Sequence, residues 1–207
     1  MGNQRVVNFI HFPKVGGKSI RHQLEEHFKG ELYRYNNNPV ARGLLLRKVT
    51  RLRHKLNLKK KHRIFFGHFG ISDSLYNSRV SKNIVMVREP IDWVCSMYFY
   101  NIQKYQITLT LPEFIKLYNL SSIYEKFIGK QPKQQFDIIG VYENYDKFLD
   151  AVSECLKIRL KDVKRNITLK TKGQYIEYLE KDKNLYSEVH TLMRHNTVIY
   201  EELRNQN

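Results

Sequence analysis

The sequence predicts an α/β fold in which helices flank a central parallel sheet. Short apolar runs bounded by polar or turn residues are typical of strands that are buried on both faces of such a sheet. Along the 207 residues, these runs alternate with longer segments whose apolar residues have helical spacing. A hydrophobic content of 42% and an aromatic content of 13% also exclude a disordered chain. At this length we expect a single domain over residues 1–207.

The first expected strand covers residues 5–12 and ends before Pro13. A glycine turn follows it, and Ile20, Leu24 and Phe28 then recur at the four-residue step of a helix. The chain therefore begins as strand, glycine turn and helix.

A second helix is expected at residues 40–61, where leucine and valine form a stripe at helical spacing. The basic residues between them should form its solvent-facing side. The remaining elements continue the alternation. We expect strands at residues 63–67, 83–87 and 136–142, and helices from Pro90, at residues 148–156 and within residues 176–192.

Positive charge dominates the composition and is unevenly placed. Lys and Arg number 36 and Asp and Glu number 20, which gives a net charge of +16. Between Leu32 and Ser72 there is no acidic residue, whereas basic residues accumulate in the expected second helix. Such a field attracts polyanions over a long range. By itself this pattern leaves open a solvated helix face, nucleic acid, an anionic glycan, acidic lipid and a phosphorylated cofactor.

Cysteine usage and hydropathy exclude several classes of protein. Cys95 and Cys155 are too few for a disulfide framework or a four-cysteine zinc site, and we expect both to be buried apolar residues. No apolar run reaches the roughly 18 residues needed to cross a bilayer. Residues 1–8 contain no signal-peptide core. We therefore expect a soluble, cytoplasmic protein without a transmembrane segment.

The turn after the first strand carries the residue types of a phosphate-binding loop. Gly16 and Gly17 let the backbone turn sharply, so that its N–H groups can point into one concavity. The helix that follows adds the positive end of its dipole, and Lys14, Lys18 and Ser19 add charge and a hydroxyl group. The fragment predicts anion binding, although an ordinary tight turn explains it equally well when it is taken alone.

The loop differs from the phosphate loop of nucleotide kinases. That motif, G-x-x-x-x-G-K-[ST], requires a glycine five residues before its second glycine, and the corresponding position here is Phe12. The strand at residues 83–87 is followed by Arg88 rather than by a carboxylate that could hold Mg²⁺. An arginine at this point indicates a second anion-binding group and no metal site.

Three segments of the sequence resemble parts of one enzyme family. Residues 9–20 read FIHFPKVGGKSI, residues 84–98 read IVMVREPIDWVCSMY, and residues 136–149 read FDIIGVYENYDKFL. They resemble the 5′-phosphosulfate loop, the 3′-phosphate segment and a third stretch of sulfotransferases that use 3′-phosphoadenosine 5′-phosphosulfate (PAPS). The resemblance is strongest to the carbohydrate O-sulfotransferase branch, which includes heparan sulfate 2-O-sulfotransferases and bacterial sulfotransferases. It covers most of the chain and implies a P-loop NTPase-like three-layer fold.

The resemblance also implies a ligand and the residues that hold it. The donor would be PAPS, the product 3′-phosphoadenosine 5′-phosphate (PAP), and no metal would take part. Val15 and Lys18 stand where the family pattern has hydroxyl residues. The residues implied for the 5′-phosphosulfate are Lys14, Gly16, Gly17, Lys18 and Ser19, and those for the 3′-phosphate are Arg88 and Ser96.

Two residues are candidates for catalysis. Negative charge grows on the bridging oxygen as the sulfuryl group leaves, and a fixed ammonium group, for which we select Lys14, stabilises such charge. The acceptor hydroxyl needs a general base, and His68 follows the strand at residues 63–67 at the expected carboxyl edge of the sheet. In this family branch a His or Glu on the corresponding segment is the base. A purely structural His68, hydrogen-bonded within its loop, stays open, and His11 is the nearest rival.

Four neighbours of the expected site each have two possible roles. Glu89 and Asp92 can belong to the site or orient the loop of Arg88. Trp93 and Phe69 can stack on adenine or belong to the core.

These observations favour a sulfotransferase that transfers a sulfuryl group from PAPS to a hydroxyl of a carbohydrate or glycolipid acceptor by in-line displacement, with His68 as the base. The acceptor can be anionic, in which case the basic helix would help to recruit it. We expect acceptor specificity in surface loops at residues 101–110 and 118–133, and no specific nucleic-acid partner. The alternatives are a small-molecule or nucleotide kinase and a non-catalytic protein that binds polyanions or nucleic acid. The sequence leaves the oligomeric state open.

Overall fold

A sheet of five parallel strands lies at the centre of the computed structural model, which describes residues 6–36, 44–57, 61–73, 80–161 and 177–205. The strand order is β2-β3-β1-β4-β5. The strands are β1 (Val6–Ile10), β2 (Leu32–Arg34), β3 (Ile64–Gly67), β4 (Val80–Val87) and β5 (Ile138–Val141). The predicted α/β class with a parallel sheet is therefore confirmed.

The strand order brings the loops after β1 and β4 together. β1 is the central strand and pairs with β3 on one side and with β4 on the other. From β1 the chain runs outward to β2 and returns to β3, and it then crosses β1 to reach β4 and β5. Because the direction of the connections reverses at β1, the carboxyl ends of β1 and β4 form the crevice where open α/β sheets bind ligands.

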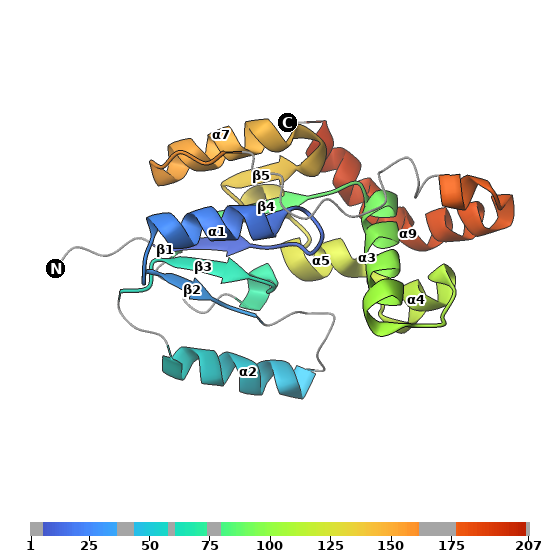
Figure 1. Ribbon diagram of the computed structural model, residues 1–207, viewed down its shortest axis with the longest axis horizontal. Coiled ribbons are helices and arrows are strands. Elements are labelled where there is room, and N and C mark those ends of the chain that lie inside the picture. The colour runs from blue at the N-terminus through green and yellow to red at the C-terminus, as the bar shows by residue number, and fades with distance from the viewer. Residues whose placement is uncertain (1–5, 37–43, 58–60, 74–79, 162–176, 206–207) are drawn as a thin grey trace.

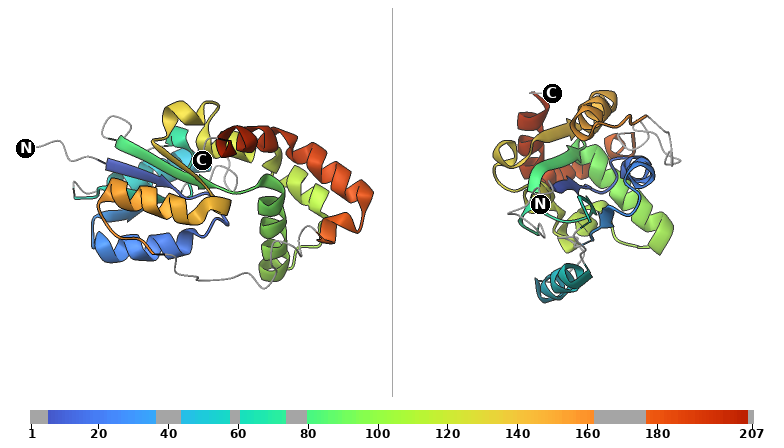
Figure 2. Two further views of the ribbon diagram at one scale, coloured as in Figure 1. Left: turned by 90° about the horizontal axis from the view of Figure 1, so that it is seen from above. Right: turned by 90° about the vertical axis from the view of Figure 1, so that its left-hand side faces the viewer.

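Helices cover both faces of the sheet. They are α1 (Gly17–His27), α2 (Leu44–Asn57), α3 (Pro90–Tyr105), α4 (Leu111–Leu117), α5 (Ile123–Ile128), α6 (Pro132–Gln135), α7 (Tyr145–Leu156) and α9 (Lys183–Arg204). Figures 1 and 2 show α1 and α7 on one face and α5 with the C-terminal part of α9 on the other. α3, α4 and the rest of α9 pack together beyond the edge at which α3 begins. The predicted three layers are therefore present.

Two strands depart most from the sequence expectation. β2 is not predicted, because its three residues lie half-buried or exposed at the edge of the sheet and form no continuous apolar run. β4 begins at Val80 rather than at residue 83. Its first half is polar: Asn83 in β4 accepts a hydrogen bond of 2.9 Å from the side chain of Asn8 in β1. Because of such polar pairs, the first half of β4 forms no continuous apolar run, and its start cannot be predicted from apolar residues.

The second helix is turned the opposite way from the expectation. α2 lies at the β2 edge of the sheet (Figure 1). On the side facing the protein, the ring nitrogen Nδ1 of His54 hydrogen-bonds to the hydroxyl group of Tyr33 at 2.8 Å. Because this side is polar, the expected apolar stripe faces outward. Three side chains of the expected stripe, Val49, Leu52 and Leu56, are more than half exposed, and so is Leu46 beside them.

Residues 118–133 are not the surface loop expected from the sequence. They contain α5 and α6, and Tyr124 and Phe127 are fully buried. Both rings meet Phe12 edge-on, at centroid distances of 4.9 and 5.0 Å. The Tyr124 hydroxyl also donates a hydrogen bond to the carbonyl of Arg88. This segment therefore supports the ends of β1 and β4 from within the core.

One hydrophobic core extends from Val6 in β1 to Leu203 in α9. Both cysteine thiols are free, and Cys95 is buried whereas Cys155 is half-buried. Within the described residues, every helix is too short or too polar to cross a membrane.

Candidate active site

The backbone of the loop between β1 and α1 has the shape of an anion-binding loop. Lys14 and Gly16 both have left-handed conformations, with φ of 62° and 77°. Gly16 precedes the first residue of α1 and offers no side chain to cap the helix, and the first turn of α1 contains no acidic residue. The positive end of the helix dipole is therefore not neutralised by an acid of its own first turn.

Gly17 is required because the ring of His11 occupies the adjacent space. A Cβ atom at residue 17 would lie 1.9 Å from His11 Nε2, which is closer than any real contact. Burial and the neighbouring His68 hold the pKa of His11 well below its ordinary value. His11 is therefore a packed, neutral ring that sets the distance between the end of β1 and the start of α1.

The side chain of Lys14 lies among other cations and is partly buried. Its Nζ atom is 4.3 Å from the centroid of the Tyr100 ring, a cation–π distance. Burial lowers the pKa of Lys14, and the charges of Arg88 and Lys18 lower it further. Three cations thus converge at the start of α1, where a bound anion would offset their mutual repulsion.

Arg88 is fixed at the end of β4 with its guanidinium group toward the β1–α1 loop. Its Nε and Nη2 atoms donate to Asp92 Oδ2 at 3.2 and 2.9 Å, and Nη1 donates to the carbonyl of Lys14 at 3.2 Å. These bonds use three of the five N–H groups of the side chain and leave two. Asp92 therefore orients Arg88, which is one of the two roles that the sequence left open for it.

The neighbouring carboxylates already have partners. Glu89 accepts hydrogen bonds from the N–H groups of Ile91 and Asp92 at 3.0 and 2.6 Å and so caps the start of α3. Glu143 accepts from the hydroxyl group of Tyr200 at 2.8 Å and from the N–H group of Glu89 at 3.2 Å. In the described part of the chain, no three His, Cys, Asp or Glu residues are grouped so as to hold a metal ion.

Ser96 lies on α3, two turns after Arg88, and is completely buried. Its Oγ atom has no hydrogen-bond partner among the described residues, and neither has Oδ1 of Asp92, one turn earlier. Buried polar atoms are nearly always paired. The turn of α3 behind Arg88 is therefore exceptional in holding two unpaired oxygen atoms.

His68 follows β3 and is held in one orientation. Its ring stacks on that of His11 at a centroid distance of 4.5 Å, and its Nδ1 atom is 2.8 Å from the carbonyl oxygen of His11. Because a carbonyl only accepts, Nδ1 carries the proton and Nε2 keeps its lone pair. Burial lowers the pKa of His68, an effect partly offset by the bond to His11, so the ring is neutral at pH 7. The bond that makes His68 structural thus also prepares Nε2 to accept a proton.

Three residues of this region are not found by reading the sequence: Asn36, Tyr100 and Tyr142. Asn36 accepts a hydrogen bond of 3.2 Å from the N–H group of His68, and the Tyr142 ring centroid lies 5.0 Å from the guanidinium carbon of Arg88. Helical spacing could have identified Tyr100, which is one turn after Ser96, and the position of Tyr142 just after β5 places it at the same sheet edge. Asn36 carries no such signal because it follows the unpredicted β2.

The two candidate adenine-stacking residues belong to the core. Trp93 is 1% exposed and donates a hydrogen bond of 2.8 Å from its indole nitrogen to the carbonyl of Pro13, and Phe69 is fully buried. Val15, which replaces a hydroxyl residue of the family pattern, is buried as well, whereas Lys18 is exposed beside the loop. Val15 therefore adds to the core, and Lys18 adds a cation to the loop.

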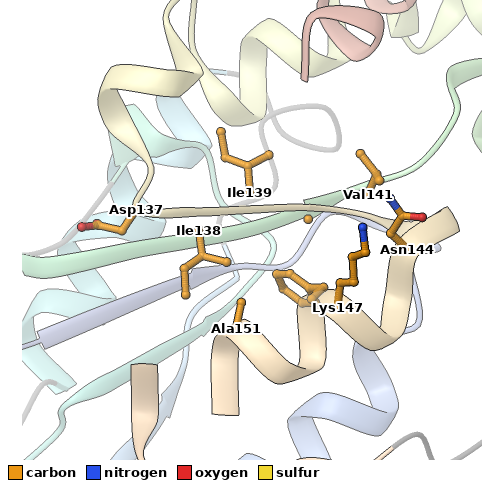
Figure 3. A pocket seen from close by; sticks show the side chains of 9 residues that line it. Asp137, Ile138, Ile139, Val141, Asn144, Lys147 and Ala151 are labelled. Carbon is orange, nitrogen blue, oxygen red and sulfur yellow. The ribbon is translucent and has the colours of Figure 1, made fainter. Parts of the chain in front are cut away.

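A separate cavity of about 260 Å³ lies between β5 and α7 (Figure 3). Ile138, Val141 and Phe148 are among the residues that line it, and Lys147 rises from α7 toward the strand. None of its lining residues belongs to the β1–α1 loop or to the ends of β3 and β4. We therefore assign it no part in the site.

Comparisons with known proteins find similar folds only among solved structures. No family model matches the sequence, and no curated protein matches it either. Among solved structures, the chain is similar to the mouse sulfotransferase SULT7A1 complexed with PAP, with a TM-score of 0.61 and 15% identity over 99% of this chain and 89% of that one. A sulfotransferase from Alicyclobacillus acidocaldarius has a TM-score of 0.49 and 12% identity over 92% and 96%. The chain therefore has the P-loop-like α/β fold of the mouse sulfotransferase.

Proposed function

We propose that this protein is a PAPS-dependent sulfotransferase. The observation that carries the proposal is the attachment of Arg88, at the end of β4, to the carbonyl of Lys14 in the loop after β1. Two cationic residues, one in the loop after β1 and one just after β4, are thereby held beside one helix start. This spacing suits a ligand with two separate anionic groups, and the fold shared with a sulfotransferase supports the same assignment.

The residues at the carboxyl edge fit the two anionic groups of PAPS. The loop at residues 14–19, with its two left-handed residues and the start of α1, would hold the 5′-phosphosulfate through N–H groups, Lys14, Lys18 and Ser19. The two remaining N–H groups of Arg88 would hold the 3′-phosphate. The unpaired hydroxyl of Ser96 would belong to the same subsite.

When bound, PAPS supplies an SO₃ group that passes to the acceptor oxygen, while the bridging oxygen keeps the electron pair and leaves as part of PAP. Lys14 stabilises negative charge at that oxygen, and its fixed position makes it effective there. His68 accepts the proton of the acceptor hydroxyl at Nε2, because Nδ1 already carries a proton. The acceptor would be a hydroxyl of a carbohydrate or glycolipid, as the resemblance of residues 9–20 to the carbohydrate branch indicates.

Binding of PAP and AMP measured by calorimetry in EDTA tests the donor site. We expect PAP to bind with a 1:1 stoichiometry and at least about tenfold more tightly than AMP, since a charge-assisted hydrogen bond is worth about 1.5–3 kcal/mol. Arg88→Lys keeps the charge but loses the planar fork, so it should lower PAP affinity by about tenfold. It should lower AMP affinity much less, and only through the lost bond to the carbonyl of Lys14. Arg204→Lys, an exposed change on α9, is the matched control.

Equal affinities for PAP and AMP would remove the role assigned to Arg88 and Ser96. Binding of ATP that requires Mg²⁺ would instead favour the kinase alternative. That alternative needs a carboxylate for the metal, and Glu89, Asp92 and Glu143 are already engaged within the fold.

A further inference from the structure

α2 presents an apolar stripe to solvent. Leu46, Val49, Leu52 and Leu56 are 55, 56, 60 and 78% exposed. Their steps of three and four residues place them on one face of the helix. In a soluble protein such a face normally packs on the core, and a contiguous exposed apolar patch marks an interaction site.

The outward orientation of the stripe is fixed by contacts on the opposite side of α2. His54 hydrogen-bonds to Tyr33 at 2.8 Å, and its ring meets that of Tyr35 edge-on at 4.8 Å. Thr50, one turn before His54, is buried on the same side. Rotating α2 so that its leucines met the sheet would break these contacts.

The stripe is bordered by cations. Lys48 and Lys55 lie along one edge of it and Arg53 along the other, and all three are exposed. α2 carries five basic residues and no acidic one, and residues 32–72 contain no acidic residue at all. The exposed surface of α2 therefore combines an apolar centre with a wholly positive border.

We propose that α2 docks this protein on the surface of an anionic lipid bilayer. A helix with apolar residues on one face and Lys or Arg beside them lies in the membrane interface, with the leucines among acyl chains and the cations at the headgroups. A polysaccharide or nucleic acid would match the charge of α2 and leave its leucines in water. A second copy of the chain would cover the leucines and oppose the three bordering cations with three more. The bilayer satisfies both features.

The docking surface is connected to the carboxyl edge by the end of β2. His54 of α2 packs on Tyr35, and the next residue, Asn36, accepts the hydrogen bond from the His68 N–H group. A bilayer under α2 would therefore lie on the β2 side of the sheet, near His68. The inference does not rest on the proposed function, since it uses no residue of the donor site.

Co-sedimentation with vesicles tests the proposal. We expect the full chain to bind vesicles of phosphatidylcholine mixed with phosphatidylserine and to bind pure phosphatidylcholine vesicles far more weakly. Leu52→Ser and Leu56→Ser should each weaken binding by about tenfold, and Lys48→Gln and Lys55→Gln each by about fivefold. The matched controls are Leu117→Ser, at an exposed leucine on α4, and Lys133→Gln, at an exposed lysine on α6; both should bind as the original chain does.

A depth measurement separates insertion from surface attraction. In Leu52→Trp, brominated acyl chains should quench the new indole, whereas Trp93 is buried and should not respond. No binding to the mixed vesicles would overturn the proposal. Unchanged binding of the serine variants, or preferential capture by heparin, would overturn it in favour of a soluble polyanion. Loss of a dimer in Leu52→Ser without vesicle binding would overturn it in favour of a second copy.

Discussion

The positive charge of this protein forms two groups that differ in how they are held. At the carboxyl edge, Lys14 and Arg88 are partly or largely buried and directed by a cation–π contact, by Asp92 and by a backbone carbonyl. On α2, Lys48 and Lys55 are exposed beside leucines that are also exposed. The first group has a fixed geometry, whereas the second is spread along one exposed face of a helix.

The difference indicates two kinds of anionic partner. Charges in fixed positions suit a small ligand whose anionic groups have fixed separations, and burial makes each contact less sensitive to salt. Charges spread along an exposed helix suit an extended surface and are screened by salt. Substitutions at the carboxyl edge should therefore leave vesicle binding intact, and substitutions on α2 should leave PAP binding intact.

The largest effect is expected at His68. His68→Ala should lower sulfuryl transfer from PAPS by about 1,000-fold, within the usual range for removal of a general base, and should leave both PAP binding and vesicle binding unchanged. Steady-state transfer of ³⁵S from labelled PAPS measures the first effect. His27→Ala, at an exposed histidine on α1, is the control and should retain full activity.

The pH dependence of transfer provides a second measurement on the same residue. The pKa of His68 is lowered from 6.5 by burial, and the base acts only when it is neutral. The pH at which the rate has fallen to half of its plateau should therefore lie below 6.5. A decrease that is complete above pH 6.5, or full turnover by His68→Ala, would show that another group accepts the proton.

A smaller effect on turnover is expected at Lys14, together with an effect of opposite sign on stability. Lys14→Met should lower transfer by about 100-fold, because it removes one preorganised positive charge near the bridging oxygen. The pKa of Lys14 in the fold is below 10.5, so the folded chain binds this proton less tightly than the unfolded chain. The charged Lys14 therefore destabilises the fold at pH 7. This destabilisation disappears as the pH rises through the lowered pKa toward 10.5.

Thermal unfolding of the ligand-free protein measures the stability effect. Lys14→Met should raise Tm at pH 7, and the gain should shrink as the pH approaches 10.5. Lys133→Met, at an exposed lysine, should show neither change. A lower Tm for Lys14→Met would mean that its contact with the Tyr100 ring outweighs the repulsion from Arg88 and Lys18.

The sequence predicts the carboxyl edge of this fold better than its outer helix. Gly16, Arg88 and His68 each follow an apolar strand, and parallel strands deliver such residues to one edge regardless of the rest of the structure. The partners that complete the site, Tyr100 and Asn36, come from tertiary contacts that spacing alone does not specify.

The orientation of α2 could not be predicted, because helical periodicity gives an apolar face but not what covers it. In this protein the hydrogen bond between Tyr33 and His54 lies on the inward side of α2, and the apolar stripe faces outward. A histidine within an otherwise basic helix gives no sequence signal that it faces inward. The same limitation hides β2, whose three residues at the sheet edge need no apolar run.

The smallest expected effect tests this orientation directly. Leu56 on α2 is 78% exposed and Leu149 on α7 is 3% exposed, so the same substitution can be compared in two helices. Leu56→Ala should change the free energy of unfolding in urea by less than about 0.5 kcal/mol, as surface changes do. Leu149→Ala should lower it by about 2–5 kcal/mol through lost burial and a cavity. If Leu56→Ala costs as much as Leu149→Ala, the α2 stripe is covered in solution by the chain itself, and α2 has no free face to offer a bilayer.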